Sequence, residues 1–291
     1  MRSLEEIFRL VASEEAFARL GVDLRTGPAG APQASLASEA GARDGLTELG
    51  WARCRGAADG LTCGRLVSAI DRLLERELPA VMVYAFAETW TVGEGLRRHV
   101  SSVLGEEYVV ADDAWAWRIP IGRAGWPPHR GIADQILDRA APEIVNAWVA
   151  LADATPDRSC MHFVPLNEDP GYPHALGSID VLPPAIRAAP IALGEALFWN
   201  ANALHWGGAC SERADGPRYS CSFTLCRADA LAGLEGRIVD PLALGFLDRT
   251  DLVARQIVTY GEGQPDVAPV VLEWARATTA LSAKMRAKSA P

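Results

Sequence analysis

The sequence lacks the features that several common classes of protein require. No apolar run approaches the roughly 18 residues of a membrane-spanning helix, and no Cys-x-x-Cys pair indicates a zinc site. The six cysteines are scattered along the chain, as is typical of free thiols in a reducing compartment. The N-terminal residues have the pattern of an acidic amphipathic helix and not of a signal peptide. We therefore expect a cytoplasmic protein with no disulfide framework and no membrane partner.

Positive charge is in short supply as well. The chain has 28 Lys and Arg residues against 37 Asp and Glu residues, which gives a net charge of −9. Nucleic-acid binding needs clustered Lys and Arg against the phosphates, so we expect no nucleic acid polymer as a partner. A local Arg can still meet a small anion. Hydrophobic residues make up 49% of the chain and charged residues 22%, which is the balance of a folded globular protein.

No internal repeat divides the 291 residues, and we expect a single domain, 1–291, built in three parts. A helical part covers about 1–105, a β part covers about 106–228, and a second helical part covers about 229–291. In the helical parts, apolar residues recur at helical spacing. The helices are expected over 4–20, 64–78, 89–105, 250–262 and 269–286. An apolar run over 79–86 is expected to form a buried strand, and the stretch 25–42, rich in Gly, Pro and Ala, a loop.

Short strand-like runs fill the middle part, separated by Gly, Pro and Asp. The strands are expected over 107–110, 114–120, 144–153, 160–166, 191–201 and 218–227. A closed or double sheet removes exposed strand edges, so this many short strands within about 120 residues favour a barrel or a jelly roll. The predicted fold class is mainly β with flanking helices, an α+β fold.

Histidine, with only five residues, is scarce enough for each to be considered in turn. His99 lies in a predicted helix beside two arginines, and we expect it at the surface. His129 follows two prolines whose rings fix the backbone, and His205 comes just after an apolar strand, so both are candidates for the rim of a β-barrel. Each could instead be a structural histidine, hydrogen-bonded within a loop. His162, on a predicted strand, and His174, in a loop, stay open as further metal ligands.

Arg218 begins a predicted strand whose side chains alternate between two faces. Ser220 and Ser222 share the face of Arg218. The other face carries Tyr219, Cys221 and Phe223. An inward arginine binds a carboxylate through its planar fork, so a buried Arg218 near two histidines would suit a dicarboxylate co-substrate. The alternative is an arginine that reaches out to solvent.

Three segments, in order, resemble one known family. They read GWPPHR from position 125, AWVALADATPDRSCMHFVPLNEDPGY from 147 and GEALFWNANALHWGGACSERADGPRYSCSFTL from 194. Over roughly residues 80–226 they look like the phytanoyl-CoA dioxygenase branch of the Fe(II)/2-oxoglutarate-dependent oxygenases. The resemblance implies a double-stranded β-helix core, a cupin-like jelly roll. It also implies that His129 and His205 bind Fe(II), that Arg218, with Ser220 beside it, binds 2-oxoglutarate, and that O2 is the co-substrate.

Gly131 departs from this pattern, because the family has His-x-Asp where the chain has His129, Arg130 and Gly131. A 2-His-1-carboxylate triad leaves three iron positions, two for 2-oxoglutarate and one for O2. Loss of the carboxylate opens a fourth. The chain is thus similar to the 2-oxoglutarate-dependent halogenases, whose pattern is His-x-Gly or His-x-Ala and which bind chloride there. The resemblance implies chlorination of an unactivated C–H bond by radical rebound, with Asn146 and Arg130 as candidate neighbours of the halide.

Other interpretations of the missing carboxylate stay open. Asp134 could reach back as the third ligand, which would make the protein a hydroxylase of the same family, or water could take that position. His162 or His174 could also substitute. The site could instead be degraded, leaving a catalytically silent binding protein. A laboratory substitution of Asp by Gly would produce the same sequence.

The substrate is expected to be a freestanding small molecule, because no carrier domain is attached, and we expect no carrier protein as a partner. In this family the segment after the His-x-Gly motif often forms a lid or a substrate loop. Asp134, Gln135 and Arg139 in that segment are therefore candidate substrate contacts, together with Trp117 and Arg130.

Length and motif order also look similar to the freestanding nucleotide halogenases, which act on a deoxyadenosine monophosphate. A tryptophan could stack on the base, and Trp126 and Trp206 are the first candidates. Cations for a phosphate would come from arginines near the strand ends. These are Arg118, Arg123, Arg130, Arg139 and Arg158.

Overall fold

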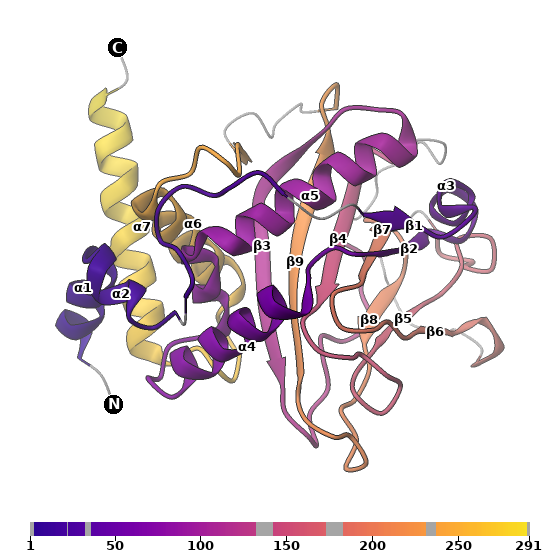
Figure 1. Cartoon of the computed structure of the whole chain (residues 1–291), viewed down its shortest axis with the longest axis horizontal. Coiled ribbons are helices and arrows are strands. Elements are labelled where there is room, and N and C mark those ends of the chain that lie inside the picture. Colours follow the sequence, from indigo (N-terminus) through magenta and orange to yellow (C-terminus); the bar gives the residue numbers. More distant parts are fainter. Residues whose placement is uncertain are drawn as a thin grey trace.

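The computed structural model describes residues 3–21, 23–32, 36–131, 142–172, 183–230 and 237–289. Within them, an antiparallel sheet has the order β1-β2-β7-β4-β9-β3-β10. Its strands are β1 (Ala37–Ser38), β2 (Trp51–Arg55), β7 (Ala196–Asn200), β4 (Ile144–Ala150), β9 (Arg218–Arg227), β3 (Tyr108–Ile119) and β10 (Ile238–Val239). Figure 1 shows β3, β9 and β4 as long neighbouring strands at the centre of the molecule. This large sheet is the main wall behind the site described below.

A smaller antiparallel sheet has the order β6-β5-β8. Its strands are β6 (Arg187–Ala189), β5 (Met161–Phe163) and β8 (His205–Gly207). One cavity is lined by residues of β3, β4 and β9 on one side and of β5 and β8 on the other. The two sheets therefore lie on opposite sides of it, which confirms the predicted jelly-roll core with flanking helices.

Helices cover the other face of the large sheet. They are α4 (Gly60–Leu74) and α5 (Ala87–Leu104), while α6 (Phe246–Tyr260) and α7 (Pro269–Ser289) lie beside the sheet. Figure 1 shows α5 crossing in front of β3, β9 and β4, with α1, α2, α6 and α7 grouped beside the sheet. The close approach of α5 depends on Gly93, because a Cβ there would lie 2.6 Å from the Phe223 ring. Phe223 also packs edge-on against Tyr84 and Trp90, which makes this face the apolar core.

Most of the predicted helices are confirmed, with one break. The stretch 4–20 forms two helices, α1 (Leu4–Ala12) and α2 (Glu14–Ala18). Ser13 lies between them in an extended conformation, and its side chain accepts a hydrogen bond from the Ala16 backbone as the N-cap of α2. Serine favours caps because it can satisfy these free N–H groups, so one periodic stretch yields two helices.

The strand predicted over 79–86 is wrong. Ala80–Ala85 form a 3-10 helix with all six residues buried. A short, continuous apolar run indicates burial but cannot distinguish a strand from a helical segment. The loop predicted over 25–42 contains the short strand β1. No strand was predicted at β2 or β10 of the large sheet, nor at β6 or β8 of the smaller one. The large sheet therefore extends beyond the stretch in which strands were expected.

His99 was expected at the surface, and that is wrong. Its Nε2 lies 2.6 Å from the Ser38 hydroxyl, and its ring stacks on Phe198. Burial lowers the pKa of His99. The side chain thus helps to hold β1 and α5 together.

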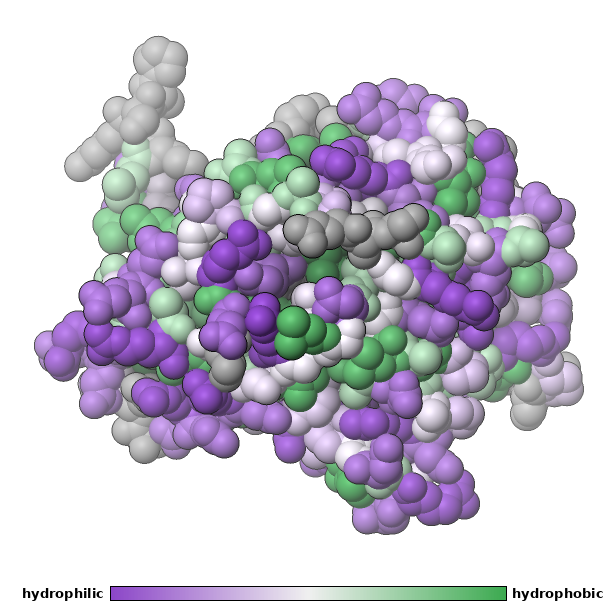
Figure 2. Space-filling model, in the orientation of Figure 1, coloured by the Kyte–Doolittle hydropathy of each residue, from purple (hydrophilic) through white to green (hydrophobic). Residues whose placement is uncertain are grey.

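No described helix combines the length and the apolar character needed to cross a membrane. The face seen in Figure 2 is largely hydrophilic, and its hydrophobic residues occur in small separate patches.

Candidate functional site

The site is a cavity of about 460 Å3 between the two sheets. Its lining includes His129, Gly131, Asn146, His205 and Arg218, which the sequence analysis had proposed from segments far apart in the chain. Ser220 lies on the same strand as Arg218 and is fully buried, but it is not among the lining residues. The structure therefore brings most of the proposed site together.

The motif Gly125–Gly131 runs alongside β8. His129 and His205 exchange two backbone hydrogen bonds, both 3.0 Å, as an antiparallel bridge. Gly125 approaches the backbone of Gly207 so closely that a Cβ on Gly125 would lie 2.8 Å from the Gly207 Cα. The glycine at 125 thus lets the motif pack against β8, and this contact places the two histidines opposite each other.

Both imidazoles are held in the tautomer that suits metal binding. Nδ1 of His129 lies 2.8 Å from the Pro127 carbonyl oxygen, and Nδ1 of His205 lies 2.9 Å from the Ala203 carbonyl oxygen. A carbonyl only accepts, so each Nδ1 carries the hydrogen and donates it, which leaves each Nε2 with a free lone pair. The ring centroids are 4.2 Å apart. The pair therefore offers two adjacent nitrogen ligands with their ring orientations fixed.

Burial keeps these rings neutral. Burial, then the proximity of His129, lowers the pKa of His205 to about 3. The pKa of His129 is also lowered, chiefly by burial. Metal binding requires a deprotonated nitrogen, so neither ring has to lose a proton near neutral pH before it binds.

Arg218 is a buried cation with free hydrogen-bonding capacity. Its side chain is 2% exposed, and one Nη donates to the Ser159 carbonyl at 3.0 Å, while Nε has no hydrogen-bond partner. The guanidinium lies over the rings of Trp148 and Trp117, and no described carboxylate pairs with it. Burial lowers the pKa of Arg218 to about 10, so it stays charged at neutral pH. A carboxylate in the cavity would supply the missing counter-ion.

Gly131 lies beside the side chain of Asn146. The Gly131 N–H donates to the Ala201 carbonyl at 2.7 Å. A Cβ at this position would lie 3.1 Å from that carbonyl oxygen and 3.3 Å from the Asn146 amide nitrogen. Both distances are tighter than ordinary contacts to a Cβ, and the first is to backbone. The local packing therefore accommodates glycine better than any larger residue.

Arg130 fastens the motif from the other side. Its guanidinium pairs with Asp169 at 2.7 Å, with both side chains almost fully buried, and donates to the Asn202 carbonyl at 2.7 Å. Arg130 lines the cavity, but these partners occupy much of its fork. It holds the histidine motif to the turn between β7 and β8.

No carboxylate completes a triad in the described part of the chain. No group of three His, Cys, Asp or Glu side chains there is placed to hold a metal ion. His162 pairs with Trp206 across β5 and β8 and stacks on its ring, on the face opposite His205, so it is not a third ligand. Asp134 and His174 lie outside the described residues.

Five tryptophans form much of the cavity wall. They are Trp115, Trp117, Trp126, Trp148 and Trp199. They include Trp117, proposed as a substrate contact, and Trp126, proposed to stack on a base. Trp206 is not a lining residue, because strand alternation places it on the outer side with His162. Gln135 and Arg139, proposed as substrate contacts, lie outside the described residues.

Most of the arginines proposed for a phosphate lie elsewhere. Arg118 bonds to Tyr219 and pairs with Asp71 on the outer face of the large sheet. Arg158 pairs with Asp215, and Arg123 is exposed outside the cavity lining. Among the described candidates only Arg130 lines the cavity. The sequence identified charges near strand ends but not which face each one takes.

Four polar lining residues were missed: Asp113, Thr224, Arg237 and Tyr260. Two of them were within reach of strand alternation, since Asp113 shares a face with Trp115 and Trp117, and Thr224 shares one with Arg218. Arg237 and Tyr260 come from the C-terminal part, where the pattern indicates only that Tyr260 lies on a helix. Nothing in the sequence brings that helix to the cavity.

Comparisons with known proteins agree with this geometry. The model of the phytanoyl-CoA dioxygenase family matches residues 86–215. No curated protein among those compared matches the chain significantly.

Solved structures share the fold at low sequence identity. AviO1 from Streptomyces viridochromogenes Tue57 is 16% identical, with a TM-score of 0.51 over 65% of this chain and 95% of its own. SnoK, a non-haem α-ketoglutarate-dependent carbocyclase from nogalamycin biosynthesis, is 14% identical, with a TM-score of 0.51 over 68% and 88%. EvdO2 from Micromonospora carbonacea var. aurantiaca is 18% identical, with a TM-score of 0.50 over 67% and 94%. The segment that carries both histidines and Gly131 therefore matches the phytanoyl-CoA dioxygenase family, on a fold shared with an α-ketoglutarate-dependent enzyme.

Proposed function

We propose that this chain is a non-haem iron, 2-oxoglutarate-dependent halogenase that chlorinates an unactivated C–H bond of a freestanding small molecule. The family match and the shared fold support the Fe(II)/2-oxoglutarate oxygenase superfamily. Chlorination, as opposed to another oxidation by that superfamily, needs an argument from the site itself. The observation that carries it is Gly131 next to two histidines that are ready to bind a metal, with no described carboxylate to complete the triad.

The residues present fit the two cofactors. His129 and His205 would bind Fe(II) through their free Nε2 atoms, since each Nδ1 is used by a backbone carbonyl. Arg218 would bind the far carboxylate of 2-oxoglutarate, because its guanidinium is buried and has an unused Nε. Iron bound there would supply the chemistry that uses O2 to oxidise a C–H bond while 2-oxoglutarate is converted to succinate and CO2. Chlorine derived from chloride would be transferred to the oxidised carbon.

Chloride would take the position beside Gly131. The amide nitrogen of Asn146, as oriented here, lies 3.3 Å from where a Cβ on residue 131 would be. An N–H group facing this point can donate to an anion, and burial strengthens such a bond. An aspartate at 131 would bring its own negative charge there. Gly131 and Asn146 together therefore favour an exchangeable anion over a fixed carboxylate.

The tryptophan walls make much of the cavity lining apolar. Their flat rings can stack on a planar substrate. A nucleotide such as a deoxyadenosine monophosphate stays a prediction. Among the described arginines proposed for its phosphate, only Arg130 lines the cavity, and it is already paired with Asp169.

Two substitutions at Gly131 test the proposal without knowledge of the substrate. Gly131→Asp adds a Cβ and a carboxylate, whereas Gly131→Ala adds the Cβ alone and controls for the crowding against Ala201. The measurement is the visible charge-transfer band of the anaerobic protein with Fe(II) and 2-oxoglutarate, titrated with chloride. We expect chloride to shift the band in the wild type and in Gly131→Ala, and not in Gly131→Asp.

Each outcome has one meaning. If chloride does not shift the band in the wild type, the halogenase proposal is contradicted and a hydroxylase that uses Fe(II) and 2-oxoglutarate is supported. Absence of any band contradicts both enzymes and supports a catalytically silent binding protein. A shift that persists in Gly131→Asp would show that chloride does not bind beside residue 131.

A further inference from the structure

The end of the cavity away from Arg218 holds the carboxylate of Asp113, which forms no ion pair with any described residue. Along β9, Arg218 begins the strand and Thr224 lies six residues later, at roughly 3.3 Å per residue. Asp113 and Tyr260 line the cavity near Thr224. This region, which we call the Asp113 subsite, consists of Asp113, Thr224 and Tyr260. None of its three residues is a proposed ligand of Fe(II) or 2-oxoglutarate, although the Thr224 hydroxyl also lies 3.2 Å from Oδ1 of Asn146.

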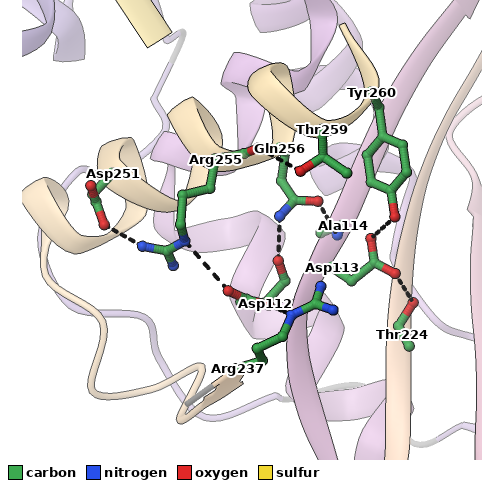
Figure 3. Close-up of polar contacts among 10 residues, drawn as sticks. All are labelled: Asp112, Asp113, Ala114, Thr224, Arg237, Asp251, Arg255, Gln256, Thr259 and Tyr260. Atoms are coloured by element: carbon green, nitrogen blue, oxygen red, sulfur yellow. Dashed lines mark hydrogen bonds and ion pairs between the residues drawn. The ribbon is translucent and has the colours of Figure 1, made fainter. Parts of the chain in front are cut away.

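The backbone at Asp113 departs from regular strand pairing. Val110 pairs with Leu225, and Ala114 pairs with Phe223. Between these two pairs β3 advances by four residues and β9 by two, so β3 has a bulge there. Such bulges redirect side chains and are common next to active sites. Gln256 on α6 stabilises the bulge by accepting from the Ala114 N–H and donating to the Asp112 carbonyl (Figure 3).

The bulge separates two adjacent carboxylates. Asp112 forms ion pairs with Arg237 and Arg255. Asp113 has no ion pair with any described residue, and its oxygens each receive one hydroxyl. Tyr260 donates to one at 2.9 Å and Thr224 to the other at 3.0 Å, as Figure 3 shows. Arg237 and Arg255 thus form their ion pairs with Asp112. Arg237 also lies close enough to Asp113 to attract it electrostatically, but it forms no ion pair with it.

A carboxylate held in this way can take a further donor. Its two oxygens offer about four acceptor positions, and the two hydroxyls occupy one on each oxygen. The Tyr260 hydroxyl stays protonated, since burial, then Asp113, raises its pKa. The Tyr260 ring also packs edge-on against Trp115 and Trp126. Aromatic faces surrounding a carboxylate suit an ammonium group, or a hydroxyl group, carried on an apolar or planar body.

We propose that the Asp113 subsite binds a hydrogen-bond donor of the substrate, an ammonium or hydroxyl group, and so orients the substrate against the tryptophan walls. This inference rests on the proposed function in treating the cavity as the substrate site and Arg218 as the 2-oxoglutarate anchor. It makes Asp113 a specificity-determining residue, because its carboxylate accepts a hydrogen bond from a donor group and disfavours an anionic group placed against it.

Four matched probes test the subsite in the metal-free protein. They are 2-phenylethylamine, 2-phenylethanol, propylbenzene and 3-phenylpropionate, which share a ring and differ in the end group. Binding is followed by tryptophan fluorescence with 2-oxoglutarate at saturating concentration, so that Arg218 is occupied. We expect the amine or the alcohol to bind at least tenfold more tightly than propylbenzene, and 3-phenylpropionate to bind most weakly. A preference for the amine identifies an ammonium substrate group, and a preference for the alcohol a hydroxyl group.

The Asp113→Asn variant removes the charge and keeps the shape. We expect it to reduce the preference for the amine over propylbenzene to within about threefold, and to leave the thermal midpoint close to that of the wild type. Asp71→Asn is the matched control, since Asp71 lies on the outer face and pairs with Arg118. It should leave the order of the four probes unchanged.

Several results would overturn the inference. These are equal affinity for all four probes, no binding by any of them, tightest binding of 3-phenylpropionate, or an order that Asp113→Asn does not alter. None of these measurements uses iron, chloride or O2, and the comparison of the wild type with Asp113→Asn at one 2-oxoglutarate concentration reports on Asp113 alone. Failure of the Asp113 subsite is therefore distinguishable from failure of the halogenase proposal.

Discussion

The two faces of β9 show how one strand serves stability on one side and chemistry on the other. Tyr219, Cys221, Phe223 and Leu225 pack into the apolar core beneath the helices. On the opposite face Arg218, Ser222 and Thr224 line the cavity, and Arg218 has an unused hydrogen-bonding group there. Neighbouring residues of the same strand therefore have different roles, one in core packing and the next in lining the cavity. The helix face is fully packed, whereas the cavity face keeps polar groups that are ready for ligands.

The largest effect on stability is expected from Phe223→Ala. Phe223 is 1% exposed and contacts Tyr84 and Trp90, so its truncation leaves a cavity beneath α5. We expect the free energy of unfolding to fall by about 3–5 kcal/mol, measured by denaturant titration. Ser222→Ala, one residue away on the cavity face, should change it by less than about 0.5 kcal/mol. Similar losses for both variants would show that the two faces do not differ in this way.

Arg218→Met, on the cavity face, is expected to weaken ligand binding and to leave stability almost unchanged. An unpaired buried charge contributes little to the folded state, so the free energy of unfolding should stay within about 1 kcal/mol of the wild type. Affinity for 2-oxoglutarate should fall by about 100-fold, or about 2.7 kcal/mol, measured by titration of the anaerobic Fe(II) protein. Arg118→Met, on the outer face of β3, should keep wild-type affinity. If Arg118→Met weakened 2-oxoglutarate binding as much, the assignment of Arg218 would be wrong.

The smallest of these effects is expected from Tyr84→Phe. The Tyr84 hydroxyl lies behind the sheet, 3.1 Å from the Trp115 carbonyl and 2.5 Å from the Ser222 carbonyl, and its removal takes a donor from these two backbone oxygens. We expect a loss of about 1 kcal/mol in the free energy of unfolding. Chloride and 2-oxoglutarate titrations should be unchanged, because the hydroxyl lies on the helix side. A change in either titration would mean that the helix face also tunes the cavity.

Local pattern was enough to predict much of this molecule. Alternation along 218–227 assigned Arg218 and Phe223 to opposite faces, and helical spacing located α4 and α5. The strand predicted at 79–86 was wrong because a run buried on every side has no periodicity to read. The two histidines proposed as ligands were assigned that role from a resemblance. Their mutual contact depends on the packing of Gly125 against Gly207, which no local pattern reveals.

The Asp113 subsite could not be predicted from the sequence, because it is formed by distant parts of the chain. Its carboxylate is aimed by a bulge in β3 and receives a hydroxyl from α6, 147 residues further along the chain. Sequence reasoning assigned 250–262 to a helix, yet helix prediction does not say which wall of a cavity the helix will complete. Features built from such distant parts appear only in three dimensions.

The reciprocal backbone bonds between His129 and His205 have a consequence for how the protein would acquire its metal. In small zinc domains the ion assembles its own ligands, so that binding and folding are one event. Here the main chain alone brings the two imidazoles together. The entropy of gathering the ligands is lost during folding, before any ion arrives, so metal occupancy is separable from the folded state. A metal ion bound between them would then be lost and regained without unfolding of the chain.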